Sequence, residues 1–421
     1  MKTNWLILCI FCMSSQILAQ NSPFSGFGLG MLAEEGNISQ QLNGGIGLSS
    51  TNPFTVNVQN PALLTRNTSV IFEAGYQFKS QKLSDNTTSQ TFTTGNLNLI
   101  ALALPVHKKW TTVIGLKPFS EVNYLTETSG KVENSDFFAY YTYNGSGGLN
   151  SLFWANGVRL SPQLSVGLKL NYIFGNITQE SISELIAAGQ NSRIAYYRRN
   201  NTKQIVFSPS VAYRHILEKD RKYLNFGLVY DLASNAKTDR IESFEKRDVF
   251  QTSVVPTFVD TLLTQEGKTF LPARLQAGFS YEEQSKWLIG ADVSLQDWTK
   301  FSSLGAEVPE LTNRIKISVG TEWTPDYRSG SFWKRSTYRL GFNHTPSILK
   351  IADKNVSETN ISIGTSLAFS GGQGKLTYVH LGANFGSRGS LSNVGLQEQY
   401  ITAKLGISLS DVLWFYRPKI D

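Results

Sequence analysis

The sequence predicts an all-β protein, a fourteen-stranded antiparallel transmembrane β-barrel with an N-terminal plug in its lumen. Three observations predict this class. Only 17% of the 421 residues are charged and 12% are aromatic, while the polar residues are mainly Ser, Thr, Asn, Gln and Gly, which favour strands and turns. No run of about 18 apolar residues follows the first twenty, so membrane-spanning helices are not expected. Apolar and polar residues instead alternate with a period of two over about ten residues, the length of a tilted membrane strand.

Residues 1–19 predict a secretory signal peptide. Lys2 gives a positive start, a short apolar stretch follows, and Ala19 offers a small residue for cleavage. Cys9 and Cys12 lie inside this segment, and neither follows a small residue as a lipoprotein signal requires. The mature chain is therefore expected to contain no cysteine, which excludes disulfide bonds, thiolate metal ligands and cysteine nucleophiles.

Residues 20–67 have no strand pattern, and they are too few to form a separate domain with its own core. We expect them to fold inside the lumen as a plug, with a disordered periplasmic tail as the alternative. Glycines in this segment should permit positive φ or close backbone approach, and an Asn-Pro pair should end the plug, because proline fixes φ and cannot donate a ladder hydrogen bond. The candidate plug or gate residues are Gly44, Gly45, Gly47, Asn60 and Pro61.

Residues 68–410 are predicted to form the barrel, and residues 411–421 a periplasmic tail. An even strand number is typical of bacterial single-chain barrels and places both termini in the periplasm. A soluble β-sandwich also alternates, but aromatic residues near the strand ends favour the membrane barrel. The predicted strands are 69–79, 94–106, 110–121, 148–160, 163–176, 203–215, 222–232, 271–283, 286–298, 312–324, 335–345, 357–369, 374–386 and 397–409.

The connections between these strands alternate in length, so short turns are expected on the periplasmic side and long loops outside. Phe137–Tyr143 is assigned to an outer loop, because one additional strand would break the even number. A basic cluster falls in another outer loop or its exit, where it would contact anionic lipopolysaccharide or simply be solvated; it consists of Arg193, Arg198, Arg199 and Lys203. The predicted outer loops are 80–93, 122–147, 177–202, 233–270, 299–311, 346–356 and 387–396.

The alternation also assigns side chains to the two faces of the wall. Leu168 faces lipid, so Leu168→Arg should cost roughly 2–4 kcal/mol. Gly167 faces the lumen, so Gly167→Ser should be far milder. Charged residues on the lumen side would pair with each other and with the plug, because isolated buried charges are costly; a water-filled pore without such pairs is the alternative. The charges expected in the lumen are Glu73, Lys169, Asp231, Arg274, Asp292, Arg314, Lys316, Glu322 and Arg339.

No motif in the chain predicts catalysis. His107, His215, His344 and His380 are widely separated, so no metal site is expected. The Gly-rich stretches lack the strand-turn-helix context of a phosphate loop, and no Gly-x-Ser-x-Gly element occurs. We therefore predict a non-enzyme without catalytic, cofactor-binding or metal-binding residues and without a nucleic-acid partner.

Several short motifs carry a family resemblance. They are Ser22–Gly30, Leu42–Leu48, Asn52–Pro53, Asn60–Leu64, Asp292–Phe301 and Tyr338–Phe342. In these stretches the sequence resembles the FadL-like superfamily, the long-chain fatty acid transporter barrels, and in particular relatives from Bacteroidota that include accessory barrels of type IX secretion. The C-terminal residues 414–421 depart from the pattern, because no terminal aromatic residue closes the last strand.

The resemblance implies an outer-membrane protein for passive transport of small hydrophobic molecules. The alternative is a non-transporting accessory or scaffold barrel of an outer-membrane protein secretion or assembly machine. A transporter should hold an apolar pocket among plug and loops, whereas an accessory barrel should have a sealed lumen and an exposed apolar patch on its loops. The loop 233–270 contains apolar residues that suit either function. The expected partners are outer-membrane lipid and lipopolysaccharide, together with a hydrophobic small molecule or a partner outer-membrane or secreted protein.

Overall fold

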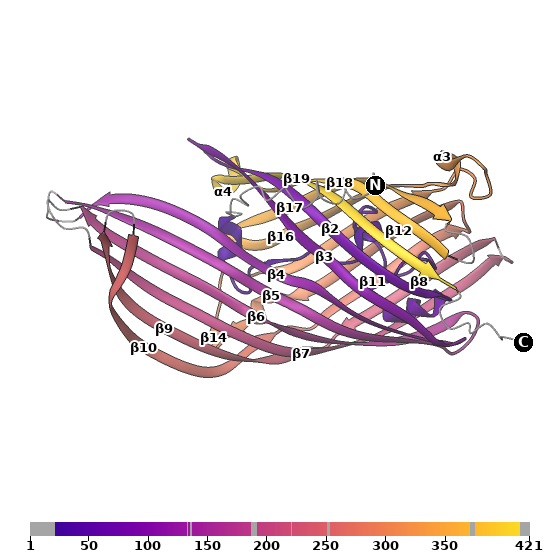
Figure 1. Cartoon of the computed structure of the whole chain (residues 1–421), viewed down its shortest axis with the longest axis horizontal. Helices are drawn as coiled ribbons and strands as arrows, with labels where there is room; N and C mark the ends of the chain where they lie inside the picture. The colour runs from indigo at the N-terminus through magenta and orange to yellow at the C-terminus, as the bar shows by residue number, and fades with distance from the viewer. Residues whose placement is uncertain are drawn as a thin grey trace, which may run out of the picture.

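The wall of the molecule is one closed antiparallel sheet, because its last strand, β19 (Leu396–Asp411), pairs with its first, β2 (Val70–Asp85) (Figure 1). The computed structural model describes residues 22–132, 134, 137–186, 192–219, 221–250, 253–370 and 375–412. Among these residues no helix is long and apolar enough to cross a membrane. The predicted signal peptide and most of the predicted C-terminal tail lie outside the described residues.

Fourteen strand paths build the wall, as predicted. Twelve are single strands: β2, β3 (Ser89–His107), β4 (Trp110–Lys131), β5 (Phe138–Arg159), β6 (Leu164–Ile186), β7 (Ser192–Glu218), β12 (Trp287–Asp297), β15 (Asn313–Trp323), β16 (Thr337–Ile351), β17 (Lys354–Ser370), β18 (Lys375–Ser390) and β19. The other two are interrupted at mid-length. One is β8 (Lys222–Asp231) followed by β9 (Ser234–Phe250), and the other is β10 (Ser253–Leu271) followed by β11 (Arg274–Glu283). The two interrupted paths pair with each other along both of their parts, since β8 pairs with β11 and β9 pairs with β10.

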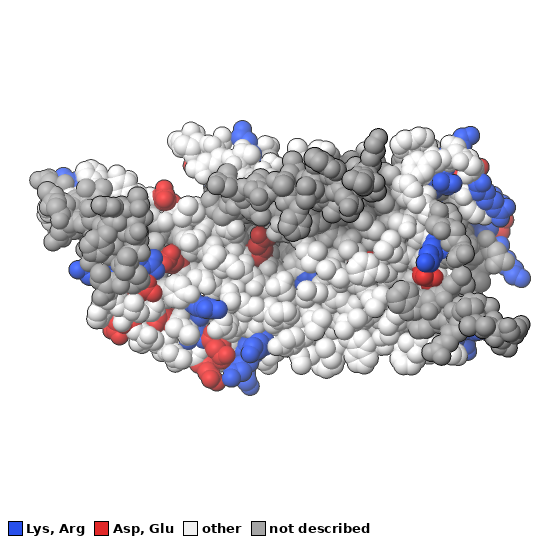
Figure 2. Space-filling model, in the orientation of Figure 1, with Lys and Arg blue, Asp and Glu red and all other residues white. Residues whose placement is uncertain are grey.

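The outer face of the wall is apolar over its middle. Leu168 is 49% exposed, and Phe207, Leu228, Phe279 and Ile289 on other strands are exposed in the same way. Figure 2 shows that charged side chains gather toward the two ends of the long axis, while the band between them is largely uncharged. A bilayer requires this distribution of a barrel wall.

Most of the predicted outer loops are wrong, because the chain continues there as strand. Residues 122–147, 177–202 and 233–270 mainly extend β4, β5, β6 and β7 or form β9 and β10, and these extensions project beyond the other strands as a curved sheet (Figure 1). We call this sheet, made by those three ranges, the outer lobe. It can face water on both sides, so its sequence lacks the apolar alternation on which the prediction depended.

Two further assignments change with the outer lobe. Phe137–Tyr143 is not a loop, since β5 begins at Phe138; the segment lengthens a strand already counted, so the even number is kept. Arg193 and Arg198 lie in β7 rather than in a loop, and they form ion pairs of 2.8 Å with Glu184 and Glu242.

Short elements complete the fold. The chain before β2 contains η1 (Pro23–Gly26), β1 (Met31–Leu32), α2 (Ile38–Gln41) and η2 (Pro61–Arg66). The connections contain η3 (Trp298–Lys300), β13 (Ser302–Ser303), β14 (Ala306–Glu307), α3 (Phe332–Arg335) and α4 (Leu391–Val394). The α2 turn begins at a capping box, in which the Asn37 side chain accepts from Gln40 N and the Gln40 side chain accepts from Asn37 N. Such reciprocal capping lets a four-residue helix persist in a largely irregular segment.

Candidate functional site

The backbone of the chain before β2 lies directly against the barrel wall. Where it does so, the wall carries glycine. A Cβ atom at Gly167 would lie 2.5 Å from Pro61 C, and one at Gly227 would lie 2.5 Å from Leu48 C, so neither position has room for a side chain. We call the wall glycines at these contacts the glycine seat; they are Gly157, Gly167, Gly227, Gly320 and Gly341.

The expected mildness of Gly167→Ser is therefore wrong. Gly167 does face the lumen, but the lumen at this height is filled by the backbone of Pro61 and Ala62. The sequence showed which face carries the glycine and gave no sign that another backbone occupies that face. The five seat glycines are functional residues that the sequence analysis missed.

The predicted plug glycines lie in the same contact region. Gly44 and Gly45 have φ of 68° and 84°, the left-handed region that glycine adopts without strain. Gly44 N donates to Ser362 Oγ at 2.9 Å, and its carbonyl accepts from Asn343 at 3.2 Å. Gly47 N donates to Asp292 Oδ2 at 2.8 Å. Gly44 therefore connects the segment to β16 and β17 and Gly47 connects it to β12, whereas Gly45 N donates within the segment to Gln40 O.

The Asn60–Pro61 pair does not end the segment. Asn60 caps η2 by accepting from Ala62 N at 3.0 Å, while its amide donates to Leu48 O at 2.6 Å. Pro61 is the first residue of that helix, where a missing N–H costs nothing. The segment continues along the wall until Asn67.

Five of the nine predicted lumen charges contact the segment. Val56 N donates to Glu73 at 2.6 Å, and Lys169 donates to Val58 O at 3.0 Å. Asp292 accepts from Gly47 N and from Leu48 N, at 2.8 and 3.0 Å. Glu322 accepts from Asn43 at 3.2 Å, and Arg274 forms an ion pair with Glu35.

The other four charges also face inward. Asp231 pairs with Arg274 at 2.5 Å, and Arg339 pairs with Glu322 at 3.0 Å. Arg314 and Lys316 line a cavity. Eight of the nine residues therefore contact the segment or line that cavity, while Arg339 is held by Glu322.

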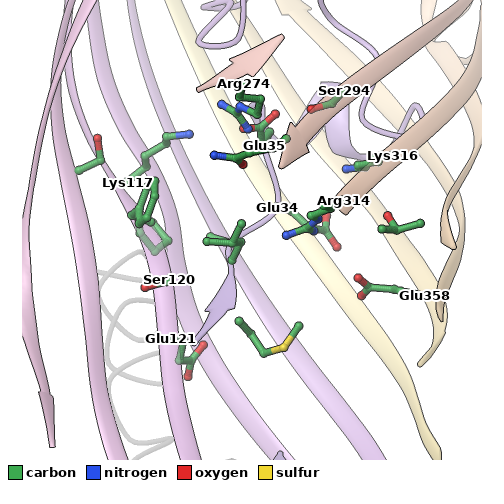
Figure 3. Close-up of a pocket in the computed structure, with 18 of the residues that line it drawn as sticks. Glu34, Glu35, Lys117, Ser120, Glu121, Arg274, Ser294, Arg314, Lys316 and Glu358 are labelled. Atoms are coloured by element: carbon green, nitrogen blue, oxygen red, sulfur yellow. The ribbon is translucent and has the colours of Figure 1, made fainter. Parts of the chain in front are cut away.

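This cavity, of about 210 Å³, is the candidate functional site (Figure 3). One part of its lining is apolar and includes Leu32, Phe119, Leu271 and Trp298, which belong to or pack against one hydrophobic cluster. The rest is strongly charged. In Figure 3, Glu34 and Glu35 lie among Arg274, Arg314 and Lys316, while Lys117 reaches in from another wall strand. The site therefore offers an apolar side and an ionic side to one small molecule.

Glu34 and Glu35 join the segment to the wall electrostatically. Glu34 forms an ion pair with Lys404, and Glu35 with Arg274. Burial opposes the ionisation of both carboxyls, but the neighbouring cations outweigh it, so the pKa of each lies below its usual range. Both side chains are therefore anions at neutral pH.

Sequence analysis missed several of these charges. Arg388 pairs with Glu358 at 2.6 Å and with Glu398 at 3.0 Å, but Arg388 lies beyond the predicted strand end at residue 386. Lys404 and Glu398 could have been assigned to the lumen from the sequence, because they alternate with the outward-facing Ile401 and Leu405 in β19. The sequence did not predict the positions of Glu34 and Glu35, since their segment has no periodic pattern of apolar residues.

The wall is incompletely paired beside the cavity. The β3–β4 ladder ends at the pair Ile100–Leu116, although β2–β3 pairing continues to Ser84–Ser89 and β4–β5 pairing to Lys131–Phe138. Beyond that point β4 pairs instead with the short strand β1, through Met31–Glu121 and Leu32–Ser120. Residues of β1, β2, β3 and β4 all line the cavity, so the cavity lies next to this unpaired stretch of β3 and β4.

A closed fourteen-stranded barrel with an apolar outer band and an N-terminal segment folded against its inner face is the fold of the FadL-like outer-membrane barrels. A family model described as BamG matches residues 1–421, and the chain belongs to the BamG family.

Solved structures share the fold at low sequence identity. The CymD monoaromatic hydrocarbon channel is 16% identical, with a TM-score of 0.56 over 91% of this chain and 99% of that one. The toluene transporter TodX of Pseudomonas putida is 14% identical, with a TM-score of 0.55 over 91% and 100%. A FadL homologue of Pseudomonas aeruginosa is 10% identical, with a TM-score of 0.55 over 90% and 98%. A search of curated proteins finds no match.

Proposed function

We propose that this barrel passes small hydrophobic molecules passively across the outer membrane, from the lumen cavity through the lateral opening between β3 and β4. The observation that carries the proposal is the early end of the β3–β4 ladder beside that cavity. An opening at this height lets an apolar molecule leave the lumen sideways, without crossing the buried segment. The hydrocarbon and toluene channels of the same fold support a cargo of this kind.

In this proposal the chain before β2 is a plug and β1 is a gate. Residues 37–67 fill the lumen through the glycine seat and the inward charges, which would block straight passage. The β1 strand holds the free edge of β4 by only two residue pairs, so its release would widen the opening at little cost. We expect the edge of β4 to be the moving boundary of the path.

A disulfide lock tests the gate. Leu32→Cys with Ser120→Cys joins paired residues of β1 and β4. Ser69→Cys with Ser410→Cys is the matched control, because these hydroxyls lie 2.6 Å apart near the β2–β19 seam. In proteoliposomes, the oxidised Leu32/Ser120 variant should take up N-phenyl-1-naphthylamine more slowly, and reductant should restore the rate. The proposal is wrong if oxidation leaves uptake unchanged or slows the control equally.

Deleting residues 22–60 tests the plug. The deleted barrel should conduct ions in planar bilayers, whereas the intact protein should conduct little. If deletion prevents assembly, Glu34→Gln with Glu35→Gln weakens the same segment without shortening the chain. Equal conductance of the intact protein and of a folded variant would show that the segment does not close the lumen.

A second candidate function, the accessory or scaffold barrel, is favoured by the outer lobe. Near the end of this lobe, Phe258 is 57% exposed and Leu262 is 54% exposed, with Val259 and Leu263 also exposed. Apolar side chains on a water-facing sheet indicate a surface for another protein. Under this function, an outer-membrane partner should co-purify with the wild type and be lost from Phe258→Ser with Leu262→Ser. Uptake of the hydrophobic probe would then be absent in both.

A further inference from the structure

Three cationic side chains of the cavity have no direct partner among the described residues. Lys117 of β4 and Arg314 and Lys316 of β15 line it. Within the described part of the chain, none of these three side chains has a hydrogen bond or an ion pair. In Figure 3 they lie around one space, with Lys117 on one wall and the β15 residues on another.

The carboxylates of the cavity already have ion-pair or hydrogen-bond partners. Glu34 pairs with Lys404, Glu35 and Asp231 pair with Arg274, and Glu358 pairs with Arg388. Glu121 accepts a hydrogen bond of 3.0 Å from Asn96. At longer range Glu35 attracts Lys117 and Glu358 attracts Arg314, but neither carboxylate forms a direct ion pair with these cations. Like charges held together in a partly buried site repel one another, so a further anion in direct contact with all three would stabilise the arrangement.

We propose that Lys117, Arg314 and Lys316 bind a small polyvalent oxyanion that carries phosphate or carboxylate groups. The guanidinium of Arg314 can bind such a group through two parallel hydrogen bonds, and the two ammonium groups act as point charges. More than one anionic group is needed, because the cations come from different walls of the cavity (Figure 3). The volume of about 210 Å³ limits the ligand to a small molecule or a single headgroup.

This anion site depends on the proposed function in one respect only, the route by which the anion reaches the cavity. Binding to the solubilised protein involves no transport, so the two proposals can fail separately. The test measures pyrophosphate and citrate binding to the full-length barrel in detergent by calorimetry, with acetate as the monovalent comparison. Wild type should bind at least one polyvalent anion more tightly than acetate, and added salt should weaken the binding.

Substitutions locate the site. Lys117→Gln and Lys316→Gln should each raise the dissociation constant about tenfold, the effect of one charge-assisted hydrogen bond. Lys237→Gln, an exposed lysine on the outer lobe, is the control and should bind as the wild type does. Heat-modifiable gel migration shows which variants are folded, and Lys117→Arg should retain binding if charge is what matters.

A second measurement identifies the source of the anion. Phosphorus that co-purifies with the wild type and is reduced in Lys316→Gln would assign the site to a lipid headgroup. Binding of added pyrophosphate or citrate without such phosphorus would assign it to a free anion. The proposal is overturned if no polyvalent anion binds and phosphorus does not differ, or if the cavity variants bind as Lys237→Gln does.

Discussion

We expect Gly167→Ala to destabilise the barrel through a steric clash on the lumen side of its wall. An added Cβ would lie 2.5 Å from Pro61 C and 2.8 Å from Ser210 Oγ, and it would overlap Ala62 N. Because two of these neighbours are backbone atoms, the clash cannot be relieved by a rotamer change. Overpacking of this kind costs about 1–3 kcal/mol. Chemical unfolding of the barrel in lipid vesicles, followed by tryptophan fluorescence, measures the loss.

Gly130→Ala is the matched control, since a Cβ at this position of β4 meets nothing within 4 Å. It should leave the free energy of unfolding unchanged or raise it slightly, because alanine restricts the unfolded chain more than glycine does. A second readout separates packing from simple instability: Gly167→Ala displaces the segment and should raise ion conductance. Equal unfolding energies for the two variants would refute the glycine seat.

The remaining predictions concern the outer face, acid and the ionic network. Leu168→Arg should cost about 2–4 kcal/mol in vesicles without raising conductance, because it acts from the lipid side; a conductance rise would contradict the assignment. Since the pKa values of Glu34 and Glu35 are lowered in the fold, their stabilisation is complete above the ordinary value of 4.5 and is lost as pH falls below it, so conductance should rise between neutral pH and about pH 3. That rise should disappear in Glu34→Gln with Glu35→Gln. Arg388→Met leaves Glu358 without an ion pair and buried Glu398 with only Lys79, and it should cost about 3–5 kcal/mol in the same unfolding assay; a loss below 1 kcal/mol would contradict the pairing.

Period-two alternation was sufficient for the wall and insufficient for the outer lobe. A strand between lipid and lumen must carry apolar residues on one face, so segments such as residues 163–176 could be assigned from sequence alone. The lobe has no lipid on either side, and stretches such as residues 192–203 mix Arg, Asn and Tyr without a period. These residues become strands because neighbouring strands supply backbone hydrogen-bond partners. The local sequence does not show which segments will be neighbours in the sheet.

The residues of the candidate site also differ in whether the sequence alone could predict their positions. Inward charges on regular strands, such as Lys316, could be assigned by counting residues. Lys117 could have been assigned in the same way, because it follows buried Thr111 and Val113 at a period of two and the register with β5 shifts only after Pro118. The glycine seat and the pair Glu34–Glu35 depend on how an irregular segment meets five distant strands, which only the folded chain brings together.

The seam between β2 and β19 limits the order in which the molecule can form. The pairs run from Val70–Asp411 to Asp85–Leu396, so the wall closes only when the last strand arrives. Residues 43–62 contact Gly167, Gly227 and Gly341, which belong to strands on different parts of the circumference. Closure of the wall joins residues 396–411 to residues 70–85, and docking of residues 43–62 joins the start of the chain to strands spread over its whole length. Both steps are long-range in sequence, so the cylinder cannot be completed until nearly the entire chain is present.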